Sequence, residues 1–130
     1  MILKFIYRNL YTKIFHDFIW ELGRELREMD FVLDVGCGAT SPIQYFSKGF
    51  YSVGVDIFKP AIALSKKEKI HNKYYVMDVM NINKKFKNNS FDCVVALDLI
   101  EHLDKSDGRK LIKKMEKIAS KKIIIFTPNG

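Results

Sequence analysis

An aspartate followed by two closely spaced glycines is the first feature of this sequence that could do chemistry. The segment reads Asp34-Val35-Gly36-Cys37-Gly38. Glycines let a backbone turn tightly and let a ligand approach without a Cβ in the way. If a helix follows the turn, its free N–H groups point toward such a ligand. An ordinary turn between a strand and a helix contains the same residues, so this feature alone is weak evidence for a binding site.

A second aspartate strengthens that interpretation by its distance along the chain. Asp56 follows Gly36 by 20 residues and ends an apolar segment. In nucleotide-binding α/β folds, an acidic residue at this spacing accepts hydrogen bonds from the ribose hydroxyls. The glycine turn and Asp56 together therefore predict a nucleoside site, whereas an isolated aspartate at the end of a strand would carry little weight.

Two further groups of polar residues also follow apolar segments. Asp78 could accept a hydrogen bond from the exocyclic amine of adenine while the N–H of Val79 donates to the ring. Asp98, Glu101 and His102 cluster after the next apolar segment. His102 is the best-placed candidate for a general base, but the start of a helix is the favoured interpretation of Glu101 and His102.

The elements that would position these side chains can be predicted from hydrophobic periodicity. Apolar runs rich in β-branched residues predict strands, and apolar residues at spacings of three and four predict helices. The predicted strands are 31–35, 51–56, 73–77, 91–97 and 122–127, and the predicted helices are 7–28, 42–48, 60–69 and about 104–119. Residues 79–90 are polar and predict no helix.

The alternation of strands and helices predicts the fold class. It indicates a doubly wound α/β fold, with a mostly parallel five-stranded sheet and helices on both faces. Ligands of such folds bind at the carboxyl ends of the strands, near the switch in strand order. Ser41 before Pro42 is typical of an N-cap followed by the first helical residue.

Composition restricts the class of protein further. The chain has 130 residues, 48% of them hydrophobic and 28% charged, which fits one globular domain. No apolar run approaches the roughly 20 residues that a membrane-spanning helix needs. Cys37 and Cys93 are too few for a disulfide-rich secreted scaffold. We therefore expect a cytoplasmic protein without a membrane span.

The charge is concentrated in one stretch of the sequence. The formal net charge is +7, and residues 65–90 carry seven lysines against two acidic residues. Such a stretch could bind nucleic acid, a membrane surface or a phosphorylated substrate. A solvated lysine-rich face is favoured, because arginine and an aromatic stacking pattern are missing from this stretch.

Five segments together resemble the class I S-adenosylmethionine-dependent methyltransferases, in particular their small-molecule "type 11" branch. They are VLDVGCGAT (32–40), VGVDI (53–57), YYVMDV (74–79), SFDCVVALDLIEHL (90–103) and IIIFTPNG (123–130). They occur in the family's order and at its spacings. The resemblance implies a Rossmann-like cofactor-binding domain over residues 31–130, preceded by an amphipathic helical region over residues 1–30.

The resemblance also implies a role for each matching position. The cofactor would be S-adenosylmethionine, and S-adenosylhomocysteine would be its product. The implied cofactor-binding residues are Gly36 and Gly38 in the turn beside the methionine moiety, Asp34 reaching the amine, Asp56 on both ribose hydroxyls, Ile57 on the adenine face, Asp78 and Val79 at the adenine edge, and the backbone near Leu97 at the amine.

The implied function is methyl transfer by in-line displacement at the sulfonium methyl. The acceptor is unidentified, and a small molecule is favoured over nucleic acid. A general base is needed only where the acceptor must lose a proton, and His102 is the candidate for that role. Residues 98–102 also resemble the E-x-x-E-H metal motif of some O-methyltransferases. Because aspartate replaces the first glutamate and a further ligand would be needed, we expect no metal.

Two other functions stay open. A cofactor-binding module or partner subunit without its own turnover would carry the same binding residues. A nicotinamide-dependent oxidoreductase shares the fold, but Ser41 stands where its G-x-G-x-x-G fingerprint has the third glycine. The D-x-G-x-G start and residues 90–103 fit the methyltransferases instead.

The predicted sheet is shorter than that of the family. The family's sheet usually has seven strands in the order 3-2-1-4-5-7-6, whereas this sequence predicts five in the order 3-2-1-4-5. The chain would then be a piece of a longer protein, with little turnover by itself. Residues 123–126 would form an open apolar edge of the kind that pairs with other chains. We therefore expect a homodimer through this fifth strand.

Overall fold

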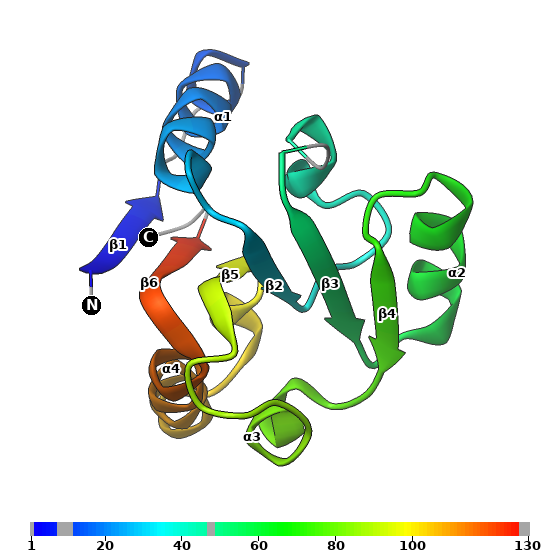
Figure 1. Cartoon of the computed structure of the whole chain (residues 1–130), viewed down its shortest axis with the longest axis vertical. Helices are drawn as coiled ribbons and strands as arrows, with labels where there is room; N and C mark the ends of the chain where they lie inside the picture. Colours follow the sequence, from blue (N-terminus) through cyan, green and yellow to red (C-terminus); the bar gives the residue numbers. More distant parts are fainter. Residues whose placement is uncertain (1, 8–11, 47–48, 128–130) are drawn as a thin grey trace.

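The computed structural model describes residues 2–7, 12–46 and 49–127, with side chains described from His16 onward. Six strands in this part of the chain form one sheet in the order β1-β6-β5-β2-β3-β4, and each neighbouring pair is parallel (Figure 1). The strands are β1 (Ile2–Tyr7), β2 (Phe31–Val35), β3 (Tyr51–Asp56), β4 (Lys73–Val76), β5 (Phe91–Leu97) and β6 (Ala119–Thr127). The five predicted strands are confirmed, and they lie in the predicted order.

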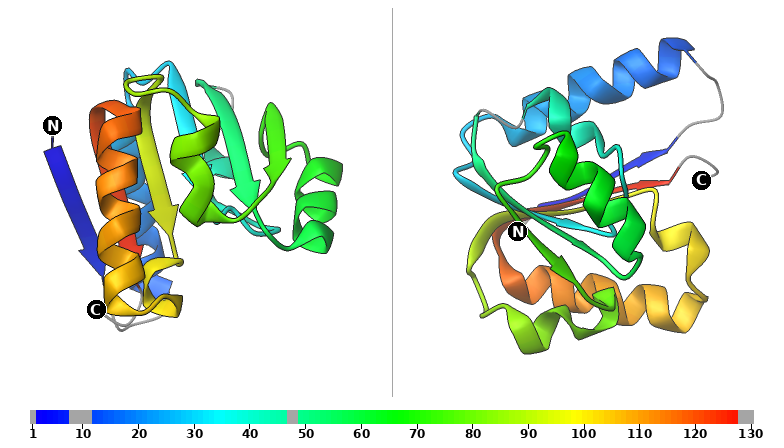
Figure 2. Two further views of the ribbon diagram at one scale, coloured as in Figure 1. Left: turned by 90° about the horizontal axis from the view of Figure 1, so that it is seen from below. Right: turned by 90° about the vertical axis from the view of Figure 1, so that its right-hand side faces the viewer.

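Helices cover both faces of the sheet. The α-helices are α1 (Thr12–Leu26), α2 (Lys59–Lys67), α3 (Ile82–Lys85) and α4 (Lys105–Ile118), and the short 3-10 helices are η1 (Pro42–Tyr45), η2 (Val79–Asn81) and η3 (Ile100–His102). The right-hand view of Figure 2 shows α1 and α2 on one side of the sheet and α3 and α4 on the other. This arrangement confirms the predicted doubly wound α/β class.

The two-residue period of the strands divides the core between these faces. In β2, Val32 packs with α1, whereas Leu33 packs with α3 and α4. In β6, Ile124 packs with α1, and its neighbours Ile123 and Ile125 pack with α4. All five side chains are fully buried. Because both faces are covered, the strands carry continuous apolar runs, as parallel sheets require.

The N-terminal region differs from its prediction. Residues 2–7 form strand β1 and α1 begins at Thr12, so a single amphipathic helix over residues 7–28 is wrong at its start. The predicted helix would have carried the aromatic residues Tyr7, Tyr11 and Phe15 on its apolar face. Tyr7 instead lies in strand β1, whereas Tyr11 and the side chain of Phe15 lie outside the part of the chain that the structure describes. Periodicity misleads here because the edge of a sheet supplies backbone hydrogen bonds that a sequence pattern does not reveal.

Strand β1 occupies the sheet edge that the sequence predicts to be open. Ile2 to Tyr7 pair in parallel with Lys122 to Thr127 of β6 (Figure 1). The sheet therefore has six strands rather than five. The expectation of a homodimer through the edge of Ile123–Phe126 loses its physical basis, because this chain's own first strand already pairs there.

Smaller differences concern three connections. Residues 79–90 contain η2 and α3, although we predicted no helix there. The helix predicted over 42–48 is reduced to the single turn of η1, whose N-cap Ser41 accepts a hydrogen bond from the N–H of Ile43 as predicted. The last strand begins at Ala119, three residues earlier than predicted.

Candidate functional site

The candidate site lies at the carboxyl edge of the sheet, where β2, β3, β4 and β5 end. The glycine turn after β2 is held against β3, since the N–H groups of Gly36 and Cys37 both donate to the carbonyl of Val55, at 2.8 and 2.9 Å. Both glycines adopt the left-handed backbone conformation, with φ of 71° at Gly36 and 60° at Gly38. Most other residues would be strained in that conformation.

The turn leaves space on one side. A Cβ at Gly36 would lie 2.9 Å from Leu99 Cδ1, whereas a Cβ at Gly38 would meet no described atom within 4 Å. The turn is therefore closed at Gly36 and open above Gly38. Burial and the neighbouring Asp34 raise the pKa of the Cys37 thiol, so this cysteine is a neutral packing group rather than a nucleophile.

Asp56 joins the end of β3 to the glycine turn. Its Oδ2 accepts from the N–H of Gly38 at 2.9 Å, and its Oδ1 accepts from the N–H of Phe58 at 2.8 Å. Two large apolar side chains follow it in exposed positions, Ile57 at 66% and Phe58 at 62% exposure. A carboxylate beside an exposed apolar surface is suited to a ligand with both polar and flat apolar parts.

Asp34 lies beneath the turn and is 1% exposed. Its Oδ2 accepts from the hydroxyl of Ser41 and lies 3.1 Å from Nε2 of His71. Its Oδ1 is buried and has no hydrogen-bond partner in the described part of the chain. Buried polar atoms are nearly always paired, so this oxygen marks a place for a donor that the chain itself does not supply.

His71 is a member of the site that the sequence did not predict. Its side chain is fully buried against the paired strands β2 and β3, with Nδ1 2.8 Å from Ser52 Oγ and Nε2 facing Asp34. The residue lies just before β4 in a polar turn, 37 positions from Asp34. No local pattern identifies it, because only the pairing of the strands brings the two residues together.

Asp78 and Val79 lie at the end of β4, as predicted. Asp78 Oδ1 caps η2 by accepting from the N–H of Met80 at 2.9 Å, and the side chain of Val79 is buried in the core. Asp78 therefore has the structural role of a helix cap, and the binding role predicted for it stays a prediction. Leu97, at the end of β5, is 7% exposed.

The segment after β5 brings three potential metal or proton ligands together. One ligand atom each from Asp98, Glu101 and His102 lie within 4.8 Å of one another. Burial and a hydrogen bond with Asp98 raise the pKa of Glu101 to about 7. His102 is 69% exposed in its side chain and lies 3.7 Å from Glu101. Glu101 and His102 are the second and last residues of η3, and α4 begins only at Lys105, so the prediction that they start a helix is wrong in its placement.

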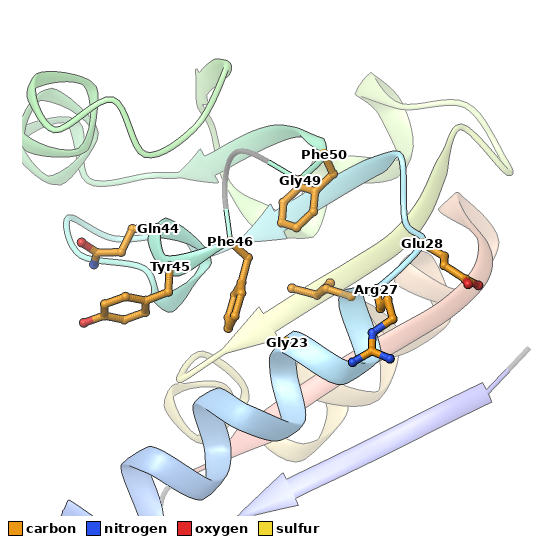
Figure 3. Close-up of a pocket in the computed structure, with 9 residues that line it drawn as sticks. Gly23, Arg27, Glu28, Gln44, Tyr45, Phe46, Gly49 and Phe50 are labelled. Atoms are coloured by element: carbon orange, nitrogen blue, oxygen red, sulfur yellow. The ribbon is translucent and has the colours of Figure 1, made fainter.

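A separate cavity of about 580 Å³ lies between the C-terminal half of α1 and the segment around η1. Figure 3 shows the ring of Phe46 beside helix α1 near Gly23, and Phe50 also lines the cavity. A Cβ at Gly23 would lie 2.7 Å from Phe46 Cε1, so the glycine permits this close packing. None of the predicted site residues lines this cavity.

Comparison with known proteins decides between the families that share this fold. A family model described as "Methyltransferase domain" matches residues 33–126. The chain belongs to this methyltransferase family. None of the helices in the described ranges is long and apolar enough to cross a membrane.

Individual relatives share less than a third of their aligned residues with this chain. Phosphoethanolamine N-methyltransferase of Plasmodium falciparum is 29% identical over 96 residues, which is 72% of this chain and 36% of that protein. Among solved structures, the PH0226 protein of Pyrococcus horikoshii OT3 has a TM-score of 0.72 at 24% identity, covering 89% of this chain and 59% of that one.

Two further structures contain the cofactor or its product. The magnesium protoporphyrin IX methyltransferase of Synechocystis PCC 6803, with bound SAM, has a TM-score of 0.71 at 16% identity and covers 87% of this chain and 56% of its own. NodS of Bradyrhizobium japonicum, in complex with S-adenosyl-L-homocysteine, has a TM-score of 0.70 at 18% identity, with coverages of 86% and 58%. This chain thus spans between about a third and three fifths of the length of these methyltransferases and related proteins.

Proposed function

We propose that this chain binds S-adenosylmethionine at the carboxyl edge of its sheet and takes part in methyl transfer to a small-molecule acceptor. The observation that carries the proposal is the buried Asp34 carboxylate, whose Oδ1 has no partner in the described part of the chain. Leaving a buried acceptor unpaired costs about 1–3 kcal/mol, and more for a charged group. The cationic amine of the cofactor's amino-acid moiety is the kind of donor that would relieve this cost.

The neighbouring turn fits the rest of that moiety. The open space above Gly38 is where a side chain would otherwise obstruct a ligand. The backbone near Leu97 ends the adjacent strand β5 and faces the same edge. We therefore assign Gly36, Gly38 and the Leu97 backbone to the methionine moiety, together with Asp34.

The nucleoside would lie along the ends of β3 and β4. A carboxylate offers about four lone-pair sites, and Asp56 uses its oxygens for the N–H groups of Gly38 and Phe58. Capacity for two ribose hydroxyls remains. The exposed side chain of Ile57 provides an apolar surface for adenine, and we assign the adenine edge to Asp78 and the N–H of Val79.

The chemistry requires orientation more than covalent help. When bound, S-adenosylmethionine supplies a methyl group already activated on a sulfonium. The chain's residues contribute by holding the reacting groups in line, an effect that reaches about 7–11 kcal/mol in model systems. Where the acceptor must lose a proton, Glu101 can accept it near neutral pH, because its pKa is about 7. The exposed His102 is the second candidate.

The nature of the acceptor and the location of the protein are part of the proposal. Two of the relatives are named for small acceptors, phosphoethanolamine and magnesium protoporphyrin IX, which supports a small molecule over nucleic acid. Cys37 and Cys93 are both buried and unpaired, which supports a reducing, cytoplasmic environment.

Calorimetric titration with S-adenosylhomocysteine tests the proposal. We expect binding to the wild-type chain, and Asp56→Ala should weaken it by about 10- to 100-fold, the range for losing hydrogen bonds to a charged group. Glu116→Gln, an exposed position on α4, is the matched control and should bind as the wild type does. Failure of the wild type to bind would refute the proposal. Binding without methyl transfer to any amine or hydroxyl acceptor would favour the cofactor-binding module over the enzyme.

A further inference from the structure

We propose that His71 is a positioning residue that aims the Asp34 carboxylate at the cofactor's amine. This inference rests on the proposed function, because it concerns the same site. It is motivated by a buried polar cluster in which side chains from β2, β3 and the turn before β4 meet. The cluster consists of Asp34, Ser52 and His71, with Ser41 completing it from the end of the glycine turn.

The hydrogen-bond partners determine where the imidazole carries its hydrogen. Nε2 lies 3.1 Å from Asp34 Oδ2, which only accepts, so Nε2 must be the donor. Nδ1 lies 2.8 Å from the Ser52 hydroxyl, which can donate to it. An imidazole protonated on Nε2 therefore satisfies both neighbours without requiring a second ring proton.

This arrangement makes the two oxygens of Asp34 unequal. Oδ2 accepts from both His71 and Ser41, which uses its two lone pairs. Oδ1 accepts from no donor in the described ranges. The cluster thus orients the carboxylate so that one oxygen stays available for a ligand, and it keeps the carboxylate from rotating.

The imidazole itself is fixed by close packing. A Cβ at Gly54 would lie 2.6 Å from His71 Cδ2, so only glycine leaves room for the ring at this place in β3. The backbone N–H of His71 donates to the Tyr74 hydroxyl at 2.9 Å, and the two rings meet edge to face at 5.5 Å. The Tyr74 hydroxyl is in turn 2.8 Å from Ser65 Oγ on α2. A ring held by Gly54, Tyr74 and Ser52 can transmit a fixed direction to Asp34.

The proposal makes the effect of His71 depend on the chemistry of the ligand. S-adenosylhomocysteine carries the amine that Asp34 would bind, whereas 5′-methylthioadenosine contains the same nucleoside without the amino-acid moiety. A residue that only stabilises the fold would alter the affinity for both ligands alike. A residue that orients Asp34 would alter the affinity for the first ligand alone.

The experiment is a titration of both ligands against the wild-type chain, His71→Leu and His71→Gln. We expect His71→Leu to weaken S-adenosylhomocysteine by about tenfold or more and 5′-methylthioadenosine by less than about threefold. His71→Gln keeps an Nε2–H that can donate to Asp34, so it should restore most of the affinity for S-adenosylhomocysteine. Equal losses for both ligands, or no loss, would overturn the positioning role. Failure of the wild type to bind S-adenosylhomocysteine would instead overturn the proposed function.

A second measurement covers the case in which His71→Leu does not fold. Nitrogen-15 NMR of the wild-type imidazole distinguishes the ring nitrogen that carries the hydrogen. We expect hydrogen on Nε2, and a change in the Nε2–H resonance when S-adenosylhomocysteine is added but not when 5′-methylthioadenosine is added. A neutral ring with its hydrogen on Nδ1 would overturn the proposal.

Discussion

Replacing Gly54 by alanine tests the packing beneath the candidate site. The added Cβ would lie 2.6 Å from His71 Cδ2 and 2.9 Å from Cys37 Sγ, distances at which neighbouring atoms must move. Neither neighbour is a flexible surface side chain, since both are buried. Overpacking of this kind costs about 1–3 kcal/mol, whereas removing a glycine from a strand gains only about 0.5–1 kcal/mol. The net expectation is a loss of about 1–2 kcal/mol in the free energy of unfolding.

Urea denaturation followed by circular dichroism measures this loss, and Gly108→Ala is the matched control. Gly108 is buried within α4, but a Cβ there would meet Ile100 Cγ2 at an ordinary 3.8 Å. The control should therefore gain about 0.5–1 kcal/mol from its helical position. If Gly54→Ala were as stable as the wild type, the contact between β3 and the imidazole would be refuted.

A double-mutant cycle identifies the clashing neighbour. In a His71→Ala background the ring is absent, so the cost of Gly54→Ala should fall while the contact with Cys37 remains. Residues in direct contact commonly show coupling of about 0.5–3 kcal/mol. An unchanged cost in that background would mean that Cys37, rather than His71, limits the space at this position.

Three further outcomes are expected. Deleting residues 1–7 should expose the edge of β6 and cause self-association, whereas the intact chain should not associate through that edge. Light scattering coupled to gel filtration measures both chains, and a monomeric deletion variant would contradict the role of β1. The pKa of Glu101 is raised from 4.5 to about 7 in the folded chain, so its contribution to stability should be present at low pH and decline as the pH rises through that interval. Glu101→Gln should flatten this decline when the free energy of unfolding is measured by denaturation from pH 4 to 8. A pH profile equal to that of the wild type would contradict this expectation. Millimolar magnesium or manganese should leave the melting temperature unchanged, because aspartate at position 98 departs from the metal motif and a further ligand is needed. A melting temperature that rises and saturates with metal concentration would contradict the expectation of no metal.

The site residues that could be predicted are those tied to strand ends. Asp34, Gly36 and Asp56 stand at fixed distances from apolar runs, and parallel topology places the ends of those runs at one edge. In the structure, the hydrogen bond from the N–H of Gly38 to Asp56 joins the glycine turn after β2 to the end of β3. The spacing of these residues along the sequence was sufficient to predict their place in the fold, because each position depends mainly on its own strand and on the order of the strands.

Features that depend on partners far along the chain could not be predicted. Strand β1 carries an apolar run, but whether it pairs with β6 depends on an edge 120 residues away that the run itself does not describe. His71 has no apolar periodicity around it, and its partners Asp34 and Ser52 belong to two different strands. Burial of a histidine in such a cluster follows from three-dimensional packing and not from the residues beside it.

Ser41 shows how a departure from one fingerprint can serve another purpose. In the sequence Ser41 predicts an N-cap before Pro42, and it counts against a nicotinamide-binding site because glycine is expected at that position. In the structure its oxygen accepts from the N–H of Ile43, capping η1, and its hydroxyl donates to Asp34. A glycine could do neither, and Asp34 would then depend on His71 alone for its orientation. The serine therefore links the start of the helical turn to the carboxylate below it, which makes the loss of the third glycine positive evidence for a site organised around Asp34.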